Sequence, residues 1–493
     1  MSRYFILVTV LAILLITGCR SDRPAETGSG KDIAAEENSP LQPGCRGCHQ
    51  NIDLDPDHRL ACTECHLGDN GSATKETAHQ GLVTSPADTT RMERSCGRCH
   101  REQVEGGIQS LHFTLAKVIN RTRTAFGITP VLASLHDIPD VGEPVSSKEE
   151  LVNDLLRRRC LRCHVHTAGD DYALVSRGRG CAACHLQFLD GRLQSHAFVR
   201  PSDRQCLSCH YGNHVGADYH GLYEHDYNWE YRTPYITTSS HVRPYGVEAH
   251  ELVPDIHQQR GLICIDCHDG PSLMQADAPQ PSCAGCHGWK PGDRIPAVAS
   301  LTRENDSLVL RSRSGSGDHP VPGLHHPAHR QYGDRVDCQV CHGQWAFNDS
   351  TTHLLLAYGS DADEWERLTV QSSSEVEAWL EHNLDSDDPE QEAAMEDQLT
   401  GRKRAGIWLQ GYTQRRWEHP VIAPDSNGRI RVFRPILDLR LSAVDREGAV
   451  LFDNLSSTGG LLPYTPHTTG PAGLFYRQRF SDLLPAAAGG RKK

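Results

Sequence analysis

Hydrophobic residues recur with helical spacing in the first half of the chain and alternate with polar residues near its end. Residues 101–127 have the helical pattern, and Ser147 to Glu150 has the form of a capping box before a second helix with Leu151 and Leu155. A similar Ser-rich start at 372–375 predicts a third helix. The composition of residues 390–410 is that of a fourth.

The pattern changes to that of β-strands near the C-terminus. Residues 429–434, 436–444 and 449–453 alternate or are rich in β-branched side chains, and residues 445–448 have the composition of a turn. Seven acidic residues in 385–397 are either a docking surface or a solvated helix face, and we expect the solvated face. The pattern therefore predicts a small C-terminal β unit appended to a body of helices and irregular loops.

The N-terminus has the layout of an export signal. Arg3 precedes an apolar run from Phe5 to Ile16, and small residues lead to Cys19. This segment resembles a bacterial lipobox, which implies a signal peptide at 1–18 and a lipid on Cys19; a retained membrane helix is the weaker alternative, since the run is short for a bilayer. Arg20 favours the outer membrane by that resemblance, on either face. Residues 19–44 are polar and rich in Pro and Gly, which predicts a flexible tether.

One short motif dominates the rest of the chain. The sequence Cys-x-x-Cys-His occurs nine times and uses 18 of the 19 cysteines, leaving only Cys19. Two thiols at this spacing can add to the two vinyl groups of one haem, and the following imidazole can bind its iron. The motifs are Cys45/Cys48/His49, Cys62/Cys65/His66, Cys96/Cys99/His100, Cys160/Cys163/His164, Cys181/Cys184/His185, Cys206/Cys209/His210, Cys264/Cys267/His268, Cys283/Cys286/His287 and Cys338/Cys341/His342, here numbered 1 to 9.

The motifs divide the chain into regions. We expect an N-terminal trihaem region at 45–159, a central one at 160–263, a third at 264–345 and a Cys-free helix and β region at 346–493. Zinc knuckles, disulfides and thioredoxin-like pairs are the alternatives, but none of them requires a histidine directly after the second cysteine. We therefore expect nine covalent c-type haems.

The second iron ligand is predicted to be histidine at most sites. Met92, Met274 and Met395 are the only methionines after the signal, whereas 29 histidines less nine in motifs leave 20. Histidine on both sides of the iron favours low reduction potentials. A zinc site at 325–329 is an alternative use of the histidines there. The candidate second ligands are His58, His79, His112, His196, His220, His257, His326, His329 and His467.

The chain resembles the multihaem c-type cytochrome lipoproteins of outer-membrane electron conduits in metal-reducing bacteria. The motifs and the lipobox carry this likeness, and phrases such as 110–114, 326–329 and 466–469 are similar to segments of large multihaem cytochromes, some associated with selenite or tellurite reductases. The resemblance implies a multihaem cytochrome c fold, mainly α-helix and irregular loops around covalent haems. It also implies other cytochromes or a porin as electron donor and acceptor.

Three functions are compatible with these features. The first is electron transfer through the haems by an exported, lipid-anchored protein. The second is a reductase of an oxyanion or small nitrogen compound, in which one iron keeps an open site. Residues 211–225 are rich in Tyr and His and could line the substrate pocket of such an enzyme. The third is a conducting filament, against which the lipid anchor argues. The formal charge of −13, with further haem propionates, excludes nucleic acid as a partner.

Overall fold

The computed structural model combines helices and sheets, with 32% of residues helical and 17% in strands. The predicted signal peptide, Cys19 and nearly all of the tether lie outside the residues that the structure describes. None of the helices in the described part is long and apolar enough to cross a bilayer. The described residues are 44–212, 216–224, 249–276, 278–348, 351–368, 371–413, 420–435 and 437–484.

Two helical segments in the first third of the chain lie where the sequence predicted them. The segment 101–127 is helical but divided into α4 (Arg101–Gln109), α5 (Leu111–Thr114) and α6 (Ala116–Ala125). The breaks fall at Ser110, which is extended, and at Leu115, whose φ of 49° is left-handed. The helix α7 (Lys148–Leu155) is confirmed, and the Ser147 hydroxyl accepts from the Glu150 N–H at 3.2 Å. It continues as the π-helix η4 (Leu156–Cys160).

The C-terminal strands form a four-stranded sheet in the order β11-β8-β14-β15. The strands predicted at 436–444 and 449–453 are confirmed as β14 and β15, and the strand predicted at 429–434 is confirmed as β13 (Ile430–Pro435) of a separate three-stranded sheet. The turn between β14 and β15 is closed by the Asp445 carboxylate, which accepts from the Ala449 N–H at 2.7 Å. The strand β14 runs parallel to β8 and antiparallel to β15. The strands are β8 (Thr352–Ala357), β11 (Ile407–Thr413), β14 (Leu439–Val444) and β15 (Val450–Ser456).

The predicted helix at 390–410 is wrong. This segment forms the hairpin of β9 (Ala394–Glu396) with β10 (Lys403–Ala405) and then enters β11. Its helix-forming composition is overridden because β11 pairs with β8 and buries three successive residues, Ile407, Trp408 and Leu409, on both faces of the sheet. The preceding helix α17 (Ser374–Asp385) starts at the predicted place, although no side chain caps it.

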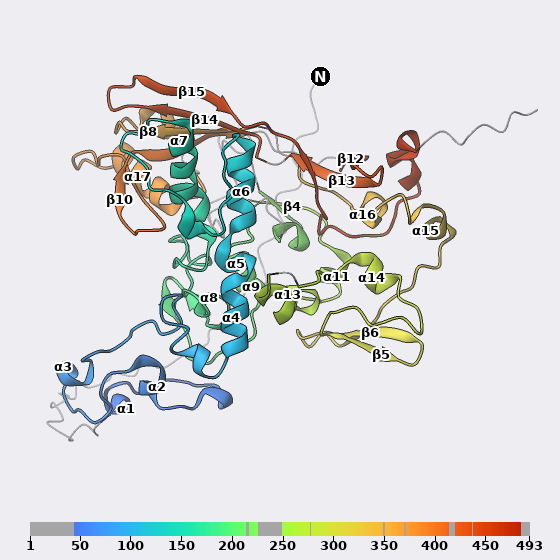
Figure 1. The fold of residues 1–493 in the computed structure, drawn as a ribbon, viewed down its shortest axis with the longest axis horizontal. Coiled ribbons are helices and arrows are strands. Elements are labelled where there is room, and N and C mark those ends of the chain that lie inside the picture. The colour runs from blue at the N-terminus through green and yellow to red at the C-terminus, as the bar shows by residue number, and fades with distance from the viewer. Residues whose placement is uncertain are drawn as a thin grey trace, which may run out of the picture.

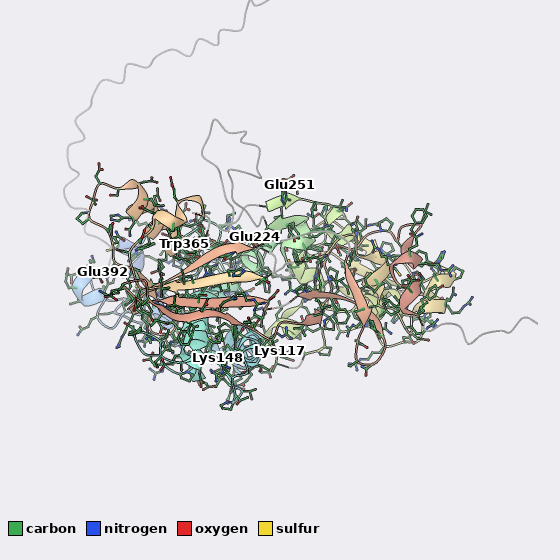
Figure 2. The ribbon with its side chains drawn as sticks, turned by 90° about the horizontal axis from the view of Figure 1, so that it is seen from above. Lys117, Lys148, Glu224, Glu251, Trp365 and Glu392 are labelled. Atoms are coloured by element: carbon green, nitrogen blue, oxygen red, sulfur yellow. The ribbon has the colours of Figure 1, made fainter. Side chains whose placement is uncertain are left out.

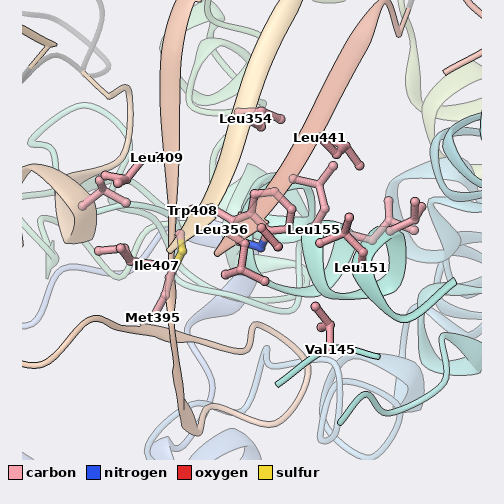
Figure 3. Close-up of a cluster of buried hydrophobic side chains, with 14 of the residues drawn as sticks. Val145, Leu151, Leu155, Leu354, Leu356, Met395, Ile407, Trp408, Leu409 and Leu441 are labelled. Atoms are coloured by element: carbon pink, nitrogen blue, oxygen red, sulfur yellow. The ribbon is translucent and has the colours of Figure 1, made fainter. Parts of the chain in front are cut away.

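The sheet and the N-terminal helices share one hydrophobic core. Leu151 and Leu155 of α7 pack against Leu356, Trp408 and Leu441 of three neighbouring strands, as Figure 3 shows. In Figure 2 the helices that carry Lys117 and Lys148 lie on one side of this sheet, and the segment with Trp365 lies on the other. The C-terminal strands are thus built into the body, because they cover the helix that leads to motif 4.

Buried charges join the same helix to the sheet. Asp154 accepts from Arg158 Nη2 at 2.7 Å and from the Trp408 indole N–H at 2.7 Å, and all three side chains are buried. One helical turn later, Arg157 contacts Asp397 at 2.6 Å. The predicted solvated helix face at 385–397 is therefore wrong at its end, since the helix stops at Asp385 and Asp397 is buried against an arginine.

The remaining elements are short and lie around the motifs. The sheet β12-β13-β16 packs Ile430 and Val432 against Val340 of α16 (Cys338–His342), to the right in Figure 1. These elements are β12 (Val421–Pro424), β13 (Ile430–Pro435), β16 (Leu461–Pro463), β1 (Phe188–Leu189), β2 (Arg192–Leu193), β3 (Leu222–Glu224), β4 (Ala249–Glu251), β5 (Leu301–Glu304), β6 (Ser307–Arg311), β7 (Asp318–Pro320), α3 (Lys75–Ala78), α11 (Ile256–Gln259), α13 (Gly270–Met274), α15 (Pro327–Tyr332), η1 (Pro56–His58), η3 (Leu135–Asp137), η6 (Ala217–His220), η8 (Asp363–Leu368), η9 (Tyr476–Arg479) and η10 (Ser481–Leu483).

Candidate haem sites

Each Cys-x-x-Cys-His motif overlaps a short helical turn. Residues three apart on such a turn lie on the same side, so both sulfurs of a motif can reach one planar group. All 18 motif cysteines are free of disulfides. The turns are α1 (Cys45–Cys48), α2 (Cys62–His66), η2 (Cys96–Arg98), η5 (Leu161–Cys163), α8 (Ala182–His185), α9 (Asp203–Leu207), α12 (Cys264–Cys267), α14 (Cys283–His287) and α16 (Cys338–His342).

The second cysteines of motifs 3 and 6, Cys99 and Cys209, lie beyond the ends of their turns. Cys99 lies one residue beyond η2, in the C-cap position, where its N–H donates to the Cys96 carbonyl at 3.1 Å. Its side chain is exposed, as are those of Cys48 and Cys184, whereas the other motif cysteines are half-buried. Cys99, a predicted haem-binding residue, therefore lies at the surface of the described structure. Its assignment stays a prediction from the motif.

Seven of the nine motif histidines face a histidine from outside the motifs. With a metal–nitrogen bond of about 2 Å and about 1 Å from that nitrogen to the ring centre, two imidazoles on opposite sides of one iron have centroids about 6 Å apart. The observed centroid distances match this spacing, so these residues fit a haem iron held by two histidines. The pairs are His49–His79 (6.0 Å), His66–His196 (6.4 Å), His100–His58 (6.1 Å), His210–His112 (6.3 Å), His268–His467 (6.2 Å), His287–His257 (6.0 Å) and His342–His329 (6.0 Å).

Backbone carbonyls orient several of the motif histidines. A carbonyl oxygen only accepts, so a ring nitrogen beside it must carry the proton, which leaves the other nitrogen as the metal ligand. His66 Nδ1 lies 2.8 Å from the Val83 oxygen, and His342 Nδ1 lies 3.0 Å from the Gly470 oxygen. His185 and His287 have the same arrangement at 3.1 and 2.9 Å. Such outer contacts fix the ring and its tautomer.

Carboxylates orient two of the facing histidines. His58 Nδ1 lies 2.8 Å from Asp55, and His257 Nδ1 lies 2.7 Å from Asp255. The hydrogen bond from His58 lowers the pKa of Asp55 to about 2. Burial opposes ionisation of Asp255, yet its hydrogen bonds with His257 keep its pKa below the usual range. The sequence analysis missed both aspartates, although each stands two or three residues before a candidate ligand.

These aspartates should tune the haem potentials. We expect Asp55→Asn to raise the reduction potential of the haem at motif 3 by roughly a few tens of millivolts, because a carboxylate partner makes the imidazole a stronger electron donor. Potentiometric titration of the holoprotein measures the shift. Asp57→Asn, an exposed neighbour whose carboxylate has no contact with that ring, is the matched control. An unchanged set of potentials in Asp55→Asn would contradict this role.

Two predicted ligands lie elsewhere. His220 Nε2 is 3.2 Å from Asp203 Oδ2 without hydrogen-bond geometry, and it lies beside Cys264 of motif 7. His326 caps α15, where its Nδ1 accepts from the Ala328 N–H at 3.2 Å, and it stands edge-on to His329. The described residues bring together one group of three possible metal ligands, Asp203, His220 and Cys264, so the alternative zinc site at 325–329 is not assembled there.

Motifs 4 and 5 lack a ring pair of this spacing in the described part of the chain. His164 is 1% exposed, and its buried Nε2 has no hydrogen-bond partner there. Its nearest ring is that of His166, at 5.3 Å, and His166 is in turn 4.8 Å from His136. The sequence analysis missed His136 and His166, although the pattern His164-Val-His166 could have drawn attention to the second. His214 and His225 lie outside the described residues.

Contacts between cysteines place the motifs in a row. Burial and then the neighbouring Cys62 raise the pKa of Cys45, so motif 1 lies next to motif 2. Burial and the nearby Cys96 raise the pKa of Cys65, so motif 2 lies next to motif 3. A hydrogen bond with Cys181 lowers the pKa of Cys96 to about 6, so motif 3 lies next to motif 5.

The row continues toward the other end of the molecule. The side-chain amide of Gln205 in α9 donates to the Cys184 carbonyl at 2.6 Å, so motif 6 lies next to motif 5. The Cys264 N–H donates to Asp203 of α9 at 2.8 Å, so motif 7 follows motif 6. Motifs 7 and 8 meet through Cys267 and Cys286, and motifs 8 and 9 meet through Cys283 and Cys338.

Motif 4 lies beside this row instead of within it. Its Cys163 is close to Cys209 of motif 6, where burial and then that thiol raise the pKa of Cys163. In Figure 1 the row runs from α1 and α2 at the lower left, past α8 and α9, to α14 and α16 on the right. The motifs thus form a line 1-2-3-5-6-7-8-9 with one branch at motif 6. Comparisons with protein-family models, curated proteins and solved structures find no match to this chain.

Proposed function

We propose that this protein is an electron-transfer protein that carries nine covalent c-type haems in a branched row. The observation that carries the proposal is the facing of seven motif histidines by a second imidazole at 6.0–6.4 Å. The facing imidazoles come from unrelated elements, such as α5, α11 and α15, which an accidental arrangement of surface histidines does not explain. The cysteines of each motif would bind the haem, and the paired histidines would hold its iron.

The neighbouring motifs support conduction along the molecule. When bound, each haem supplies a one-electron carrier of low potential if both axial ligands are histidine. The protein's own part is to fix each ring, through the carbonyl and carboxylate contacts of His66, His257 and His342, and to hold consecutive motifs in contact. No bond chemistry on a substrate is required of any residue in this function.

The proposed setting follows from the N-terminal sequence. A lipid on Cys19 would tether the exported protein to a membrane, and a polar tether would separate the first motif from it. The partners would be other cytochromes or a porin as donor and acceptor. Globomycin, which blocks lipoprotein signal cleavage, should cause accumulation of the uncleaved precursor; normal processing with the drug present would contradict the lipid anchor.

The row predicts that motif 6, as an interior member of the line, is an indispensable link. We expect Cys206→Ser with Cys209→Ser to lower the current through an oriented protein monolayer by more than an order of magnitude, because motif 6 joins motifs 5 and 7. The matched control is Cys160→Ser with Cys163→Ser, which removes the branch and leaves the row continuous. Mass spectrometry should find nine haems in the natural protein and eight in each variant. Equal currents in both variants would contradict the row.

A further inference from the structure

Motif 4 differs from the other motifs in the described residues. Its histidine is the one buried among the nine motif histidines, and, like that of motif 5, it faces no described imidazole at the spacing of the seven pairs. His166 does not supply that imidazole: its Nε2 lies 3.3 Å from the Phe113 carbonyl and its Nδ1 lies 2.9 Å from the Thr89 hydroxyl. A neutral imidazole so placed donates from one nitrogen and accepts at the other, so no lone pair is left for iron.

The other nearby histidine is no better placed. His136 is exposed, and its ring stands edge-on to His166, at 90°, instead of facing His164. The Nδ1 of His164 accepts from the backbone N–H of His166 at 3.0 Å, and this contact fixes the orientation of the ring. This contact puts the proton of a neutral ring on the orphaned Nε2, so binding of iron at Nε2 would require that proton to leave and the Nδ1 contact to be lost. The opposite axial position is free of any described histidine.

The backbone and the charges around motif 4 are also unusual. The π-helix η4 runs directly into Cys160, and such turns are frequent at functional sites. Arg159 and Arg177 are buried, and Arg177 donates to the His164 carbonyl at 2.9 Å. Buried Arg159 Nη1 and Arg177 Nε have no hydrogen-bond partner in the described residues. Burial lowers the pKa of Arg159 to about 10, so it stays charged at neutral pH.

The charges do not balance at this site. Arg159, Arg162 and Arg177 are cationic, and the carboxylate among them, that of Asp170, binds Arg162 at 3.0 Å. Even when both haem propionates are counted against these arginines, a ferric haem would leave one positive charge uncompensated. A buried excess of positive charge favours a small anion near the iron.

We infer that the haem of motif 4 keeps one axial position of its iron without a histidine and binds a small monovalent anion there. This inference rests on the proposed nine-haem protein and adds a ligand site to it. The site lies on the branch of the row, so a ligand bound there receives electrons through motif 6 without interrupting the line from motif 1 to motif 9. That placement is suited to a terminal acceptor, as in the reductase alternative.

The test uses the full-length ferric holoprotein with azide as the probe. Electron paramagnetic resonance should show a high-spin haem that azide converts to low spin with a saturable optical change, beside low-spin haems. Cys160→Ser with Cys163→Ser should abolish both signals. Cys283→Ser with Cys286→Ser at motif 8, where His257 faces the motif histidine, is the matched control and should keep both.

Several outcomes would overturn the inference. If every haem of the natural protein were low-spin, the inference would be overturned without the need for any variant. A high-spin signal that survives loss of motif 4 and disappears in Cys181→Ser with Cys184→Ser would also overturn it. If the motif 4 variant does not fold, Arg162→Gln should still weaken azide binding about tenfold by removing one charge, and unchanged affinity would refute the anion site. Loss of end-to-end current with the azide site intact would instead count against the proposed electron transfer.

Discussion

Replacing His329 with alanine should convert the haem iron of motif 9 from low spin to high spin, whereas replacing His326 should not. The two histidines are three residues apart, but only the ring of His329 faces His342, at 6.0 Å and 30°. His326 instead caps α15 through its Nδ1. The loss of an axial imidazole leaves the iron five-coordinate, which is a complete change of its electronic state and not a graded one.

Electron paramagnetic resonance of the two variants measures this difference directly. The His329→Ala protein should gain one high-spin haem over the natural protein, and the His326→Ala protein should gain none. His326→Ala should cost only part of a helix cap, about 1 kcal/mol. If His326→Ala produced the high-spin signal and His329→Ala did not, the assignment of the two residues would be reversed, and the ring-spacing argument would fail for the other six pairs as well.

Replacing Asp154 with alanine should destabilise the protein by about 3–5 kcal/mol, the largest effect on stability that we expect from a single polar residue. The change leaves the buried guanidinium of Arg158 without its carboxylate and removes the acceptor of the Trp408 indole N–H. Arg158 keeps its bonds to the carbonyls of Ala405 and Gly406, at 3.0 and 2.6 Å, so the charge cannot leave the core without breaking these too.

Denaturant unfolding of the holoprotein, followed by far-ultraviolet circular dichroism, measures the effect. Arg101→Ala removes the exposed pair with Glu105 and is the control, with an expected change under about 0.5 kcal/mol. The double variant Asp154→Ala with Arg158→Met should lose less than the sum of its two single variants, because the stranded charge is then absent. Strict additivity would show that the two side chains do not depend on each other.

Local patterns were predictable from the sequence, and partners distant in the chain were not. Ser147 and the alternating residues after 429 depend on neighbours within a few positions, so their helix start and strands follow from spacing. The segment 390–410 has helix-forming residues but becomes strands because β8 lies beside it. Its partner is about 50 residues away, and no local pattern records that contact.

The same distinction applies to the candidate sites. The motifs are read directly from Cys and His at fixed spacing, but His112 meets His210 and His467 meets His268 across large separations in the chain. The composition could show only that the chain has enough histidines to give every iron a second ligand. The pattern also could not separate His326 from His329, since only the orientation of α15 decides which ring faces motif 9.

The last part of the chain completes sites that begin far upstream. His467 faces the histidine of motif 7, and the carbonyl of Gly470 orients the histidine of motif 9. A chain exported from its N-terminus onward would present all nine motifs for haem attachment before this tail emerged. In the proposed cytochrome, premature stop codons or C-terminal proteolysis would therefore yield fully pigmented molecules in which the iron of motif 7 lacks its second histidine and the histidine of motif 9 lacks its orienting carbonyl. Colour alone would then be an unsafe criterion of intact material in any purification.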